Sequence, residues 1–205
     1  MRVFLDVDGP ILDVSARYYA VHVAIAGDSM SRDFFWEQKR AGMGGRAIVE
    51  HNGLDVSADE YSRRWVAEIE AAEHMHLDVL QPGVFEAMDA LRSFATVTFV
   101  SLRQNGPQLR AQLRRLGVAK DEAILSASPL DGHGPELKVE LIRAHGFDAA
   151  DAIIGDTRID LEAGHALGLR TIGVTCGIRT RADLAQASPS IIVANLSAAV
   201  SWLRP

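Results

Sequence analysis

The stretch Val3-Phe4-Leu5-Asp6-Val7-Asp8-Gly9 indicates which fold the sequence favours. Its apolar residues continue without a polar interruption up to the first acidic residue, which is typical of a β-strand covered on both faces. Similar apolar runs recur at residues 96–100, 123–125, 152–154, 171–174 and 191–193. Helical patterns that end at a glycine lie between the later runs. This alternation predicts an α/β fold with a Rossmann-like parallel sheet and helices on both of its faces.

The long segment between the first two predicted strands has helical patterns and little strand signal. Ser57 and Glu60, for example, have the spacing of a capping box at a helix start. Such helices could be extra core helices, or an insertion that covers the carboxyl edge of the sheet as a lid. We predict the insertion, with an α-helical cap domain at residues 14–81 and a core domain made of residues 1–13 and 82–205.

Composition and charge exclude several classes of protein. The 205 residues are 48% hydrophobic and 23% charged, unlike a disordered, collagen-like or disulfide-stapled chain. A formal net charge of −6 argues against a large binding surface for DNA or RNA. A small anionic ligand is compatible with this charge, because a few local cations can act against the global sign. We therefore expect no nucleic-acid partner.

Three features of the sequence bear on its location. No apolar run approaches the roughly 18 residues that span a bilayer. Two carboxylates within the first eight residues leave no room for the apolar part of a secretory signal. The one cysteine, Cys176, cannot form an internal disulfide, which fits a reducing compartment. We expect a cytoplasmic protein without a membrane partner, present as a monomer or a homodimer.

Polar residues stand at the ends of the predicted strands, or at the start of the helix before the fourth strand. These residues are Asp6, Asp8, Ser101, Arg103, Lys138, Asp156 and Asp160. Ligands of open parallel sheets bind outside the carboxyl ends of the strands, so we expect these side chains to gather at one edge. Carboxylates a few ångströms apart raise one another's pKa unless a cation neutralises them, and oxygen-only ligands favour Mg²⁺.

The same residue types indicate phosphoryl chemistry. A carboxylate can attack as a nucleophile and form an acyl phosphate. Asp6 and Asp8 are two residues apart, so in extended backbone both side chains project to the same side, where one can attack and the other can handle a proton. Ser101 and Lys138 would hold the phosphoryl oxygens, and a metal would offset the charge of the transferring group. The cluster therefore predicts a phosphorylated substrate.

Four segments of the chain resemble, in order and spacing, the four motifs of the haloacid dehalogenase-like (HAD) hydrolase superfamily. They are Asp6-Val7-Asp8-Gly9, Ser101, Lys138 and Gly155-Asp156-Thr157-Arg158-Ile159-Asp160. The insertion after the first strand is similar to the small helical cap of phosphoglycolate-phosphatase-like members. The resemblance implies an Mg²⁺-dependent phosphatase that hydrolyses a small phosphorylated metabolite, a phosphomonoester, through an aspartyl-phosphate on Asp6.

The resemblance also implies roles for single residues. Asp6 would be the nucleophile and Asp8 the general acid/base, whereas Ser101 and Lys138 would orient the phosphoryl group. True dehalogenases lack the second aspartate, so Asp8 favours phosphoryl transfer over dehalogenation. The residues implied to hold Mg²⁺ are Asp6, Asp8 through its backbone carbonyl, Asp156 and, in support, Asp160.

Further residues are candidates for contact with the substrate. They are Gly9, Leu102, Arg103 and, from the cap, Arg46. Arg46 ends a glycine-rich stretch at 41–46 that fits a lid loop and equally fits an ordinary helix connection. Arg103 could instead cap the helix that follows it. Two positions depart from the superfamily's pattern: Pro10 stands where threonine is usual, and Val139 where proline often follows the lysine. Neither is a reacting group.

Two other functions stay open at this point. A phosphosugar mutase of the same fold would return the phosphoryl group to its substrate. Such mutases usually have the cap pattern Gly-x-x-Arg-x-x-Ser, which is absent here because Met43 stands three residues before Arg46 and Val49 three residues after it. A phospho-receiver signalling domain also clusters aspartates, a hydroxyl residue and a lysine on a parallel sheet. It would lack the long insertion, and its acceptor would follow the third strand, which here is followed by no acid at 125–128.

Overall fold

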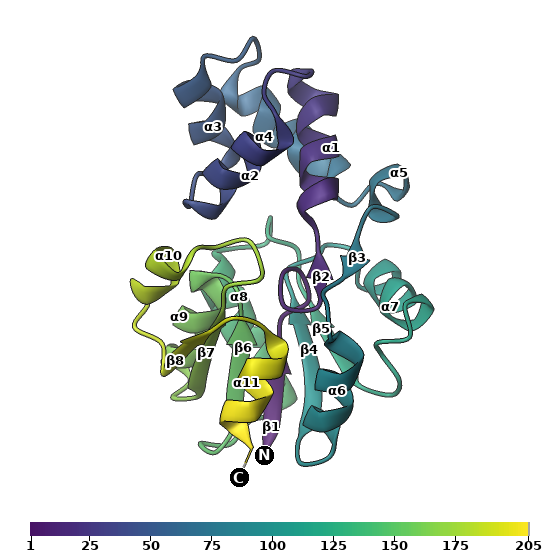
Figure 1. Ribbon diagram of the computed structural model, residues 1–205, viewed down its shortest axis with the longest axis vertical. Coiled ribbons are helices and arrows are strands. Elements are labelled where there is room, and N and C mark those ends of the chain that lie inside the picture. Colours follow the sequence, from purple (N-terminus) through teal and green to yellow (C-terminus); the bar gives the residue numbers. More distant parts are fainter. Residues whose placement is uncertain (205) are drawn as a thin grey trace.

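Six parallel strands form the central sheet, in the order β5-β4-β1-β6-β7-β8 (Figure 1). The computed structural model describes residues 1–204. The strands of the sheet are β1 (Arg2–Leu5), β4 (Thr96–Ser101), β5 (Ala123–Ser126), β6 (Ala152–Gly155), β7 (Arg170–Val174) and β8 (Ile191–Val193). β1 pairs with β4 on one side and β6 on the other, so the residues that follow it emerge at the middle of the carboxyl edge. The predicted α/β fold is confirmed.

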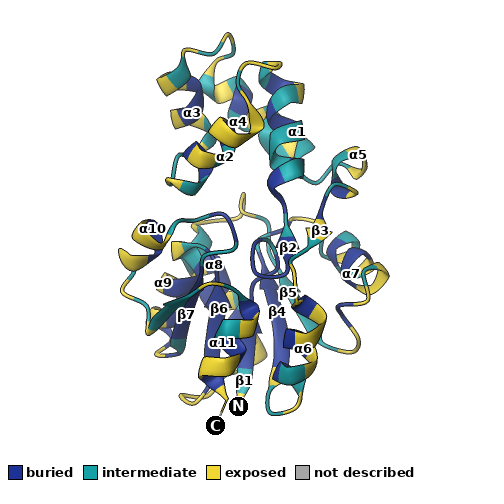
Figure 2. Ribbon diagram, viewed as in Figure 1, coloured by how far each residue is buried: buried dark blue, intermediate teal, exposed yellow. Residues whose placement is uncertain are grey.

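Helices cover both faces of this sheet. They are α6 (Val84–Arg92), α7 (Gly106–Arg115), α8 (Gly134–His145), α9 (Arg158–Ala166), α10 (Arg181–Ala185) and α11 (Leu196–Leu203). Val3 and Leu5 of β1 belong to an apolar cluster with residues of α6, α7 and α11, whereas Phe4 belongs to a second cluster with residues of α8 and α9. The inner strands β1, β4, β6 and β7 are therefore buried for most of their length, whereas the edge strands β5 and β8 are half-buried (Figure 2). Cover on both faces explains the uninterrupted apolar run of β1 in the sequence.

A group of helices that we call the cap helices stands above the carboxyl edge of the sheet (Figure 1). They are α1 (Ser15–Ala26), α2 (Arg32–Arg40), α3 (Gly45–Asn52), α4 (Ala58–Glu68) and α5 (Ala72–Met75). The chain enters and leaves them through a short antiparallel pair, β2 (Leu12–Asp13) and β3 (Val79–Leu80). The cap helices have an apolar cluster of their own around Val21 and Tyr61. The domain boundaries at 14 and 81 stay a prediction.

Serine side chains begin two of the cap helices. The Ser31 hydroxyl accepts a hydrogen bond from the Phe34 N–H, and the Ser57 hydroxyl accepts one from the Glu60 N–H. The Glu60 carboxylate pairs with Arg63 instead of returning a bond to Ser57, so only half of the predicted capping box forms. Among residues 1–204, no helix combines the length and the apolar character needed to cross a membrane.

Candidate active site

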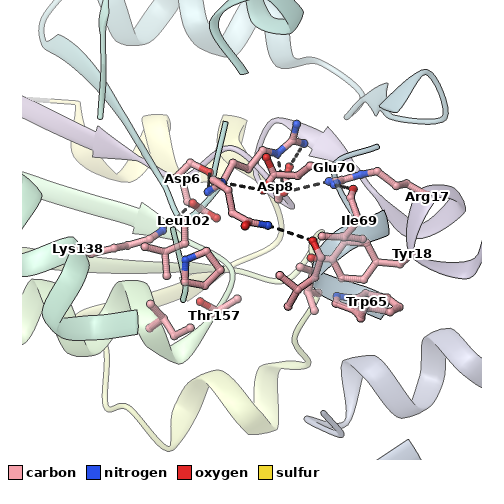
Figure 3. Close-up of a pocket in the computed structure, with 17 residues that line it drawn as sticks. Asp6, Asp8, Arg17, Tyr18, Trp65, Ile69, Glu70, Leu102, Lys138 and Thr157 are labelled. Carbon is pink, nitrogen blue, oxygen red and sulfur yellow. Dashed lines mark hydrogen bonds and ion pairs between the residues drawn. The ribbon is translucent and has the colours of Figure 1, made fainter. Parts of the chain in front are cut away.

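A cavity of about 260 Å³ lies between the cap helices and the carboxyl edge of the sheet (Figure 3). Its floor comes from the edge and includes Asp6, Asp8, Ser101, Lys138 and Thr157. Its other wall comes from α1, α4 and the turn after α4. The gathering of polar side chains expected at the sheet edge is therefore present, and the cap closes over it. Thr157 is an additional floor residue, which the sequence offered only as part of a motif.

Lys138 joins two carboxylates at the floor. Its Nζ lies 2.7 Å from Asp6 Oδ1, donates to Asp160 Oδ1, and lies 3.2 Å from the Val100 carbonyl oxygen. Burial alone would lower the pKa of Lys138, but the charges of Asp160 and Asp6 outweigh burial and raise it. The lysine is therefore a buried cation held in a fixed position beside the carboxylate that the sequence predicts to be the nucleophile.

Asp6, Asp156 and Asp160 form a buried group of carboxylates whose oxygens lie within 4.8 Å of one another. Burial raises the pKa of Asp6 to about 7 despite Lys138, and burial together with the charges of Asp6 and Asp160 raises the pKa of Asp156 well above its usual value. Asp156 Oδ1 is buried without a hydrogen-bond partner within residues 1–204. An oxygen-only set with an unpartnered buried oxygen fits a hard divalent cation such as Mg²⁺.

Gly9 allows the backbone to approach this group closely. Its φ is +104°, and a Cβ at this position would collide with the Asp156 carboxylate. The Gly9 carbonyl accepts a hydrogen bond from Gln81 Nε2 at 3.0 Å. This bond joins the turn to the residue that follows β3, where the chain leaves the cap helices. Gly9 does not line the cavity, so its predicted contact with the substrate stays a prediction, and its position has a packing reason instead.

Asp8 faces the same cavity in a different electrostatic environment. Its Oδ2 accepts hydrogen bonds from Arg103 Nε and Arg17 Nη2, both at 3.0 Å, and its Oδ1 accepts from Arg103 Nη2. Burial would raise the pKa of Asp8, but Arg103 and Arg17 outweigh burial and hold it well below its usual value. β1 ends at Leu5, so Asp6 and Asp8 follow the strand, and Asp8 forms an isolated β-bridge with Leu12 instead of continuing the extended strand assumed from sequence.

Asp78 completes a buried charge network behind Asp8. Its side chain is fully buried, and it accepts hydrogen bonds from Arg17 Nε at 2.8 Å, Arg103 Nη2 at 3.0 Å and Gln112 Nε2 at 2.9 Å. We call Asp8, Arg17, Asp78 and Arg103 the arginine–aspartate network. Arg17 comes from the cap and Arg103 from the core, whereas Asp78 directly precedes β3, where the chain leaves the cap helices. The network therefore joins three separate parts of the chain. Sequence reasoning missed Arg17 and Asp78.

Arg103 was assigned two alternative roles from sequence, and the structure decides against one of them. The helix after it, α7, is capped by Asn105, whose Oδ1 accepts from the Gln108 N–H at 3.0 Å. Arg103 is buried and its guanidinium faces the carboxylates of Asp8 and Asp78. It lines the cavity, as does Leu102, while its charge is directed to the network.

Arg46 lies away from the cavity. It belongs to α3, its side chain is 60% exposed, and its guanidinium pairs with Asp59 of α4. Its predicted contact with the substrate therefore stays a prediction that would need a different position of the side chain.

Asp160 has two roles in the structure. It forms a complete capping box with Thr157 at the start of α9, and it also accepts a hydrogen bond from Lys138.

Lys39 of α2 supports the aromatic wall of the cavity. It is 9% exposed, and its Nζ lies 5.1 Å from the ring centre of Trp65 and 5.6 Å from that of Tyr18. Burial, together with the nearby charge of Arg179, lowers the pKa of Lys39 to about 8.

This lowered pKa predicts a pH-dependent stability. Between pH 8 and pH 10 the unfolded chain holds the Lys39 proton more tightly than the folded chain, so the folded state gains stability as pH rises. Relative to Lys39→Met, the wild-type protein should gain about 2 kcal/mol of unfolding free energy between pH 7 and pH 9.5. Urea unfolding at both pH values measures this gain, with the exposed Lys120→Met as the matched control. A constant difference between wild type and Lys39→Met would contradict it.

Comparisons with known proteins agree with this architecture. Residues 134–199 match the HAD-hydrolase-like family. The chain is 30% identical over 123 residues to the protein named probable phosphatase IndB of Dickeya dadantii, which covers 58% of this chain and 54% of that protein. The chain thus spans about half the length of this curated relative.

Solved structures share the fold over nearly the whole chain. A haloacid dehalogenase-like family hydrolase from Streptococcus pneumoniae superposes with a TM-score of 0.78 at 18% identity, covering 99% of this chain and 98% of that one. A predicted phosphoglycolate phosphatase from Haemophilus somnus gives 0.73 at 17% identity, covering 99% and 97%. A structure from Thermotoga maritima named as a β-phosphoglucomutase gives 0.68 at 19% identity, covering 99% and 98%. The fold alone therefore does not separate hydrolysis from phosphoryl return.

Proposed function

We propose that the chain is a member of the haloacid dehalogenase-like hydrolase superfamily, and that it is a phosphatase that hydrolyses a small phosphomonoester through an aspartyl-phosphate on Asp6. The observation that carries the proposal is the surrounding of Asp6, a buried carboxylate that opens onto the cavity between Lys138 and the Asp156–Asp160 pair. A nucleophile needs this access, and a phosphoryl group needs the nearby cation.

In the first step, an oxygen of Asp6 attacks phosphorus, the new P–O bond forms, and the bond to the leaving oxygen breaks. Lys138 stays within reach of the phosphoryl oxygens, and the hydroxyls of Ser101 and Thr157 line the same floor. Asp6, Asp156 and Asp160 would hold Mg²⁺, which would supply neutralising charge for the phosphoryl group. The leaving alcohol takes a proton from Asp8.

In the second step, water attacks the phosphorus of the aspartyl-phosphate, Asp8 accepts a proton from that water, and Asp6 is released. Arg17 and Arg103 keep Asp8 ionised in the structure, which suits this second step. Proton donation in the first step requires a protonated Asp8. At least one of the two arginines must therefore interact less strongly with Asp8, so that its pKa rises. Because Arg17 belongs to the cap, a cap movement would change this hold.

The proposal predicts metal-dependent phosphate release. Purified protein with p-nitrophenyl phosphate and Mg²⁺ should release phosphate, and EDTA should reduce the rate to the uncatalysed level. Without the metal, Lys138 is the one cation among residues 1–204 that is bonded within the group of three carboxylates, and it does not neutralise them enough for a further anion to bind. Addition of Mg²⁺ in excess of EDTA should restore the rate. Release that is insensitive to EDTA would contradict the assigned role of the carboxylate group.

A further inference from the structure

We propose that the substrate's leaving group presents a flat, largely apolar ring to the cavity, as in an aryl or arylalkyl phosphomonoester, and that it is not a polyhydroxylated sugar. This inference rests on the proposed phosphatase function and names its substrate class. It concerns the part of the cavity away from the carboxylates, which we call the leaving-group wall. Three features of this wall carry it: its apolar lining, the pairing of its polar groups and its size.

The leaving-group wall is apolar on both of its sides. Tyr18, Trp65 and Val66 contribute to it from the cap, and Leu102 and Ile159 face them from the core. The rings of Tyr18 and Trp65 meet edge to face with their centres 5.3 Å apart, as Figure 3 shows from the cavity side. This is a preferred arrangement for aromatic pairs, and it offers an apolar surface on which a third ring can pack.

The polar groups next to this wall already have partners. The Glu70 carboxylate accepts the N–H groups of Gln104 at 2.8 Å and Asn105 at 3.0 Å. Gln104 Nε2 donates to the Val66 carbonyl oxygen at 3.2 Å. These bonds join the end of α4 to the loop after β4, so a ligand that used them would separate the cap from the core.

The guanidinium groups at this wall are also occupied. Arg17 donates to Asp8, Asp78 and the Ile69 carbonyl, and Arg103 donates to Asp8 and Asp78. A sugar that entered here would bury several hydroxyl groups without partners, and each such group lowers affinity by about tenfold.

The polar groups left over are few. Within residues 1–204 the Tyr18 hydroxyl makes no hydrogen bond, and the exposed Gln104, whose Nε2 is bonded to Val66, has only its side-chain oxygen left for a ligand. The cavity volume of about 260 Å³ lies below the roughly 300–1,000 Å³ that is usual for drug-sized ligands, and part of it must hold the phosphoryl group. A single ring with at most one or two polar substituents satisfies both conditions.

The test compares esters whose leaving alcohols have similar reactivity. Benzyl phosphate and ribose 5-phosphate are both esters of primary alcohols, so a difference in kcat/KM reports recognition of the leaving group. We expect kcat/KM to be at least about tenfold higher for benzyl phosphate, since one ring is packed and several hydroxyls stay without partners. Equal values, or a preference for ribose 5-phosphate, would overturn the inference.

A binding measurement keeps this inference separate from the proposed function. Phosphonates cannot lose their organic group by hydrolysis, so calorimetry with benzylphosphonate and methylphosphonate in the presence of Mg²⁺ reports the wall without turnover. Tighter binding of benzylphosphonate by about tenfold supports the inference even if no ester is hydrolysed, in which case only the phosphatase proposal fails. Equal binding of the two phosphonates overturns the inference even if esters are hydrolysed.

A variant of the wall locates the effect. Val66→Thr keeps the side-chain shape and adds a hydroxyl to the apolar surface, so it should reduce the benzyl-to-ribose ratio of kcat/KM several-fold. The matched control is Val79→Thr, at a position of β3 that is 57% exposed and outside the cavity, and it should leave the ratio unchanged. If both variants keep the wild-type ratio, the assignment of the preference to this wall is wrong.

Discussion

Asp6→Asn should lower the rate of phosphate release at least about 1,000-fold, because the amide cannot form the acyl phosphate and the other groups of the site cannot replace a nucleophile. The substitution keeps the side-chain shape in a position where Lys138 Nζ lies 2.7 Å from Asp6 Oδ1. Lys138 also retains its bond to Asp160, so its charge stays partnered. The loss should therefore appear in kcat with a folded protein.

The stability of this variant is a second and independent readout. Burial raises the pKa of Asp6 to about 7, so in the metal-free protein at pH 8 the folded state carries a carboxylate that its surroundings disfavour. Removal of that charge should leave the urea midpoint of Asp6→Asn equal to or higher than that of the wild type. Asp59→Asn, on the cap surface, is the matched control for activity. Wild-type turnover in Asp6→Asn would refute the covalent mechanism.

Much of the sheet could be predicted from the sequence because its strands are covered on both faces. Such strands leave uninterrupted apolar runs, and the polar residue that ends each run marks the carboxyl edge. This reasoning brought Asp6, Ser101 and Asp156 to one edge. It also brought Lys138 there. A helix that connects two parallel strands starts near the carboxyl edge of the sheet, and Lys138 lies near the start of α8, which connects β5 to β6.

The arginine–aspartate network could not be predicted in the same way. Arg103 and Asp8 are 95 residues apart in the sequence, and Arg17 and Asp78 are 61 apart. No periodicity or motif links such positions, since the contacts depend on how the cap docks on the core. Arg46 is an exposed cation after a glycine-rich stretch, a pattern that fits a lid and equally fits a helix connection; here it pairs with Asp59 of a neighbouring helix, and its contact with the substrate stays a prediction.

Asp78→Asn should have the largest effect on stability of any single substitution discussed, although Asp78 touches no reacting group in the proposed mechanism. Its carboxylate is fully buried and accepts hydrogen bonds from Arg17, Arg103 and Gln112. The neutral amide leaves two buried guanidinium groups with Asp8 as their one remaining carboxylate. Removal of one partner from a buried ion pair costs about 3–5 kcal/mol of unfolding free energy, because the other charge stays buried.

The same substitution should slow the reaction through Asp8. Without Asp78, both arginines are left to Asp8, which should hold its pKa still lower and make proton donation to the leaving alcohol less favourable. We expect kcat for benzyl phosphate to fall more than its KM rises. The fall in kcat should be smaller for p-nitrophenyl phosphate, whose leaving group needs no proton. A merely structural role would slow both esters equally. Urea unfolding and kinetics with both esters, beside the exposed Asp89→Asn as control, separate the two cases.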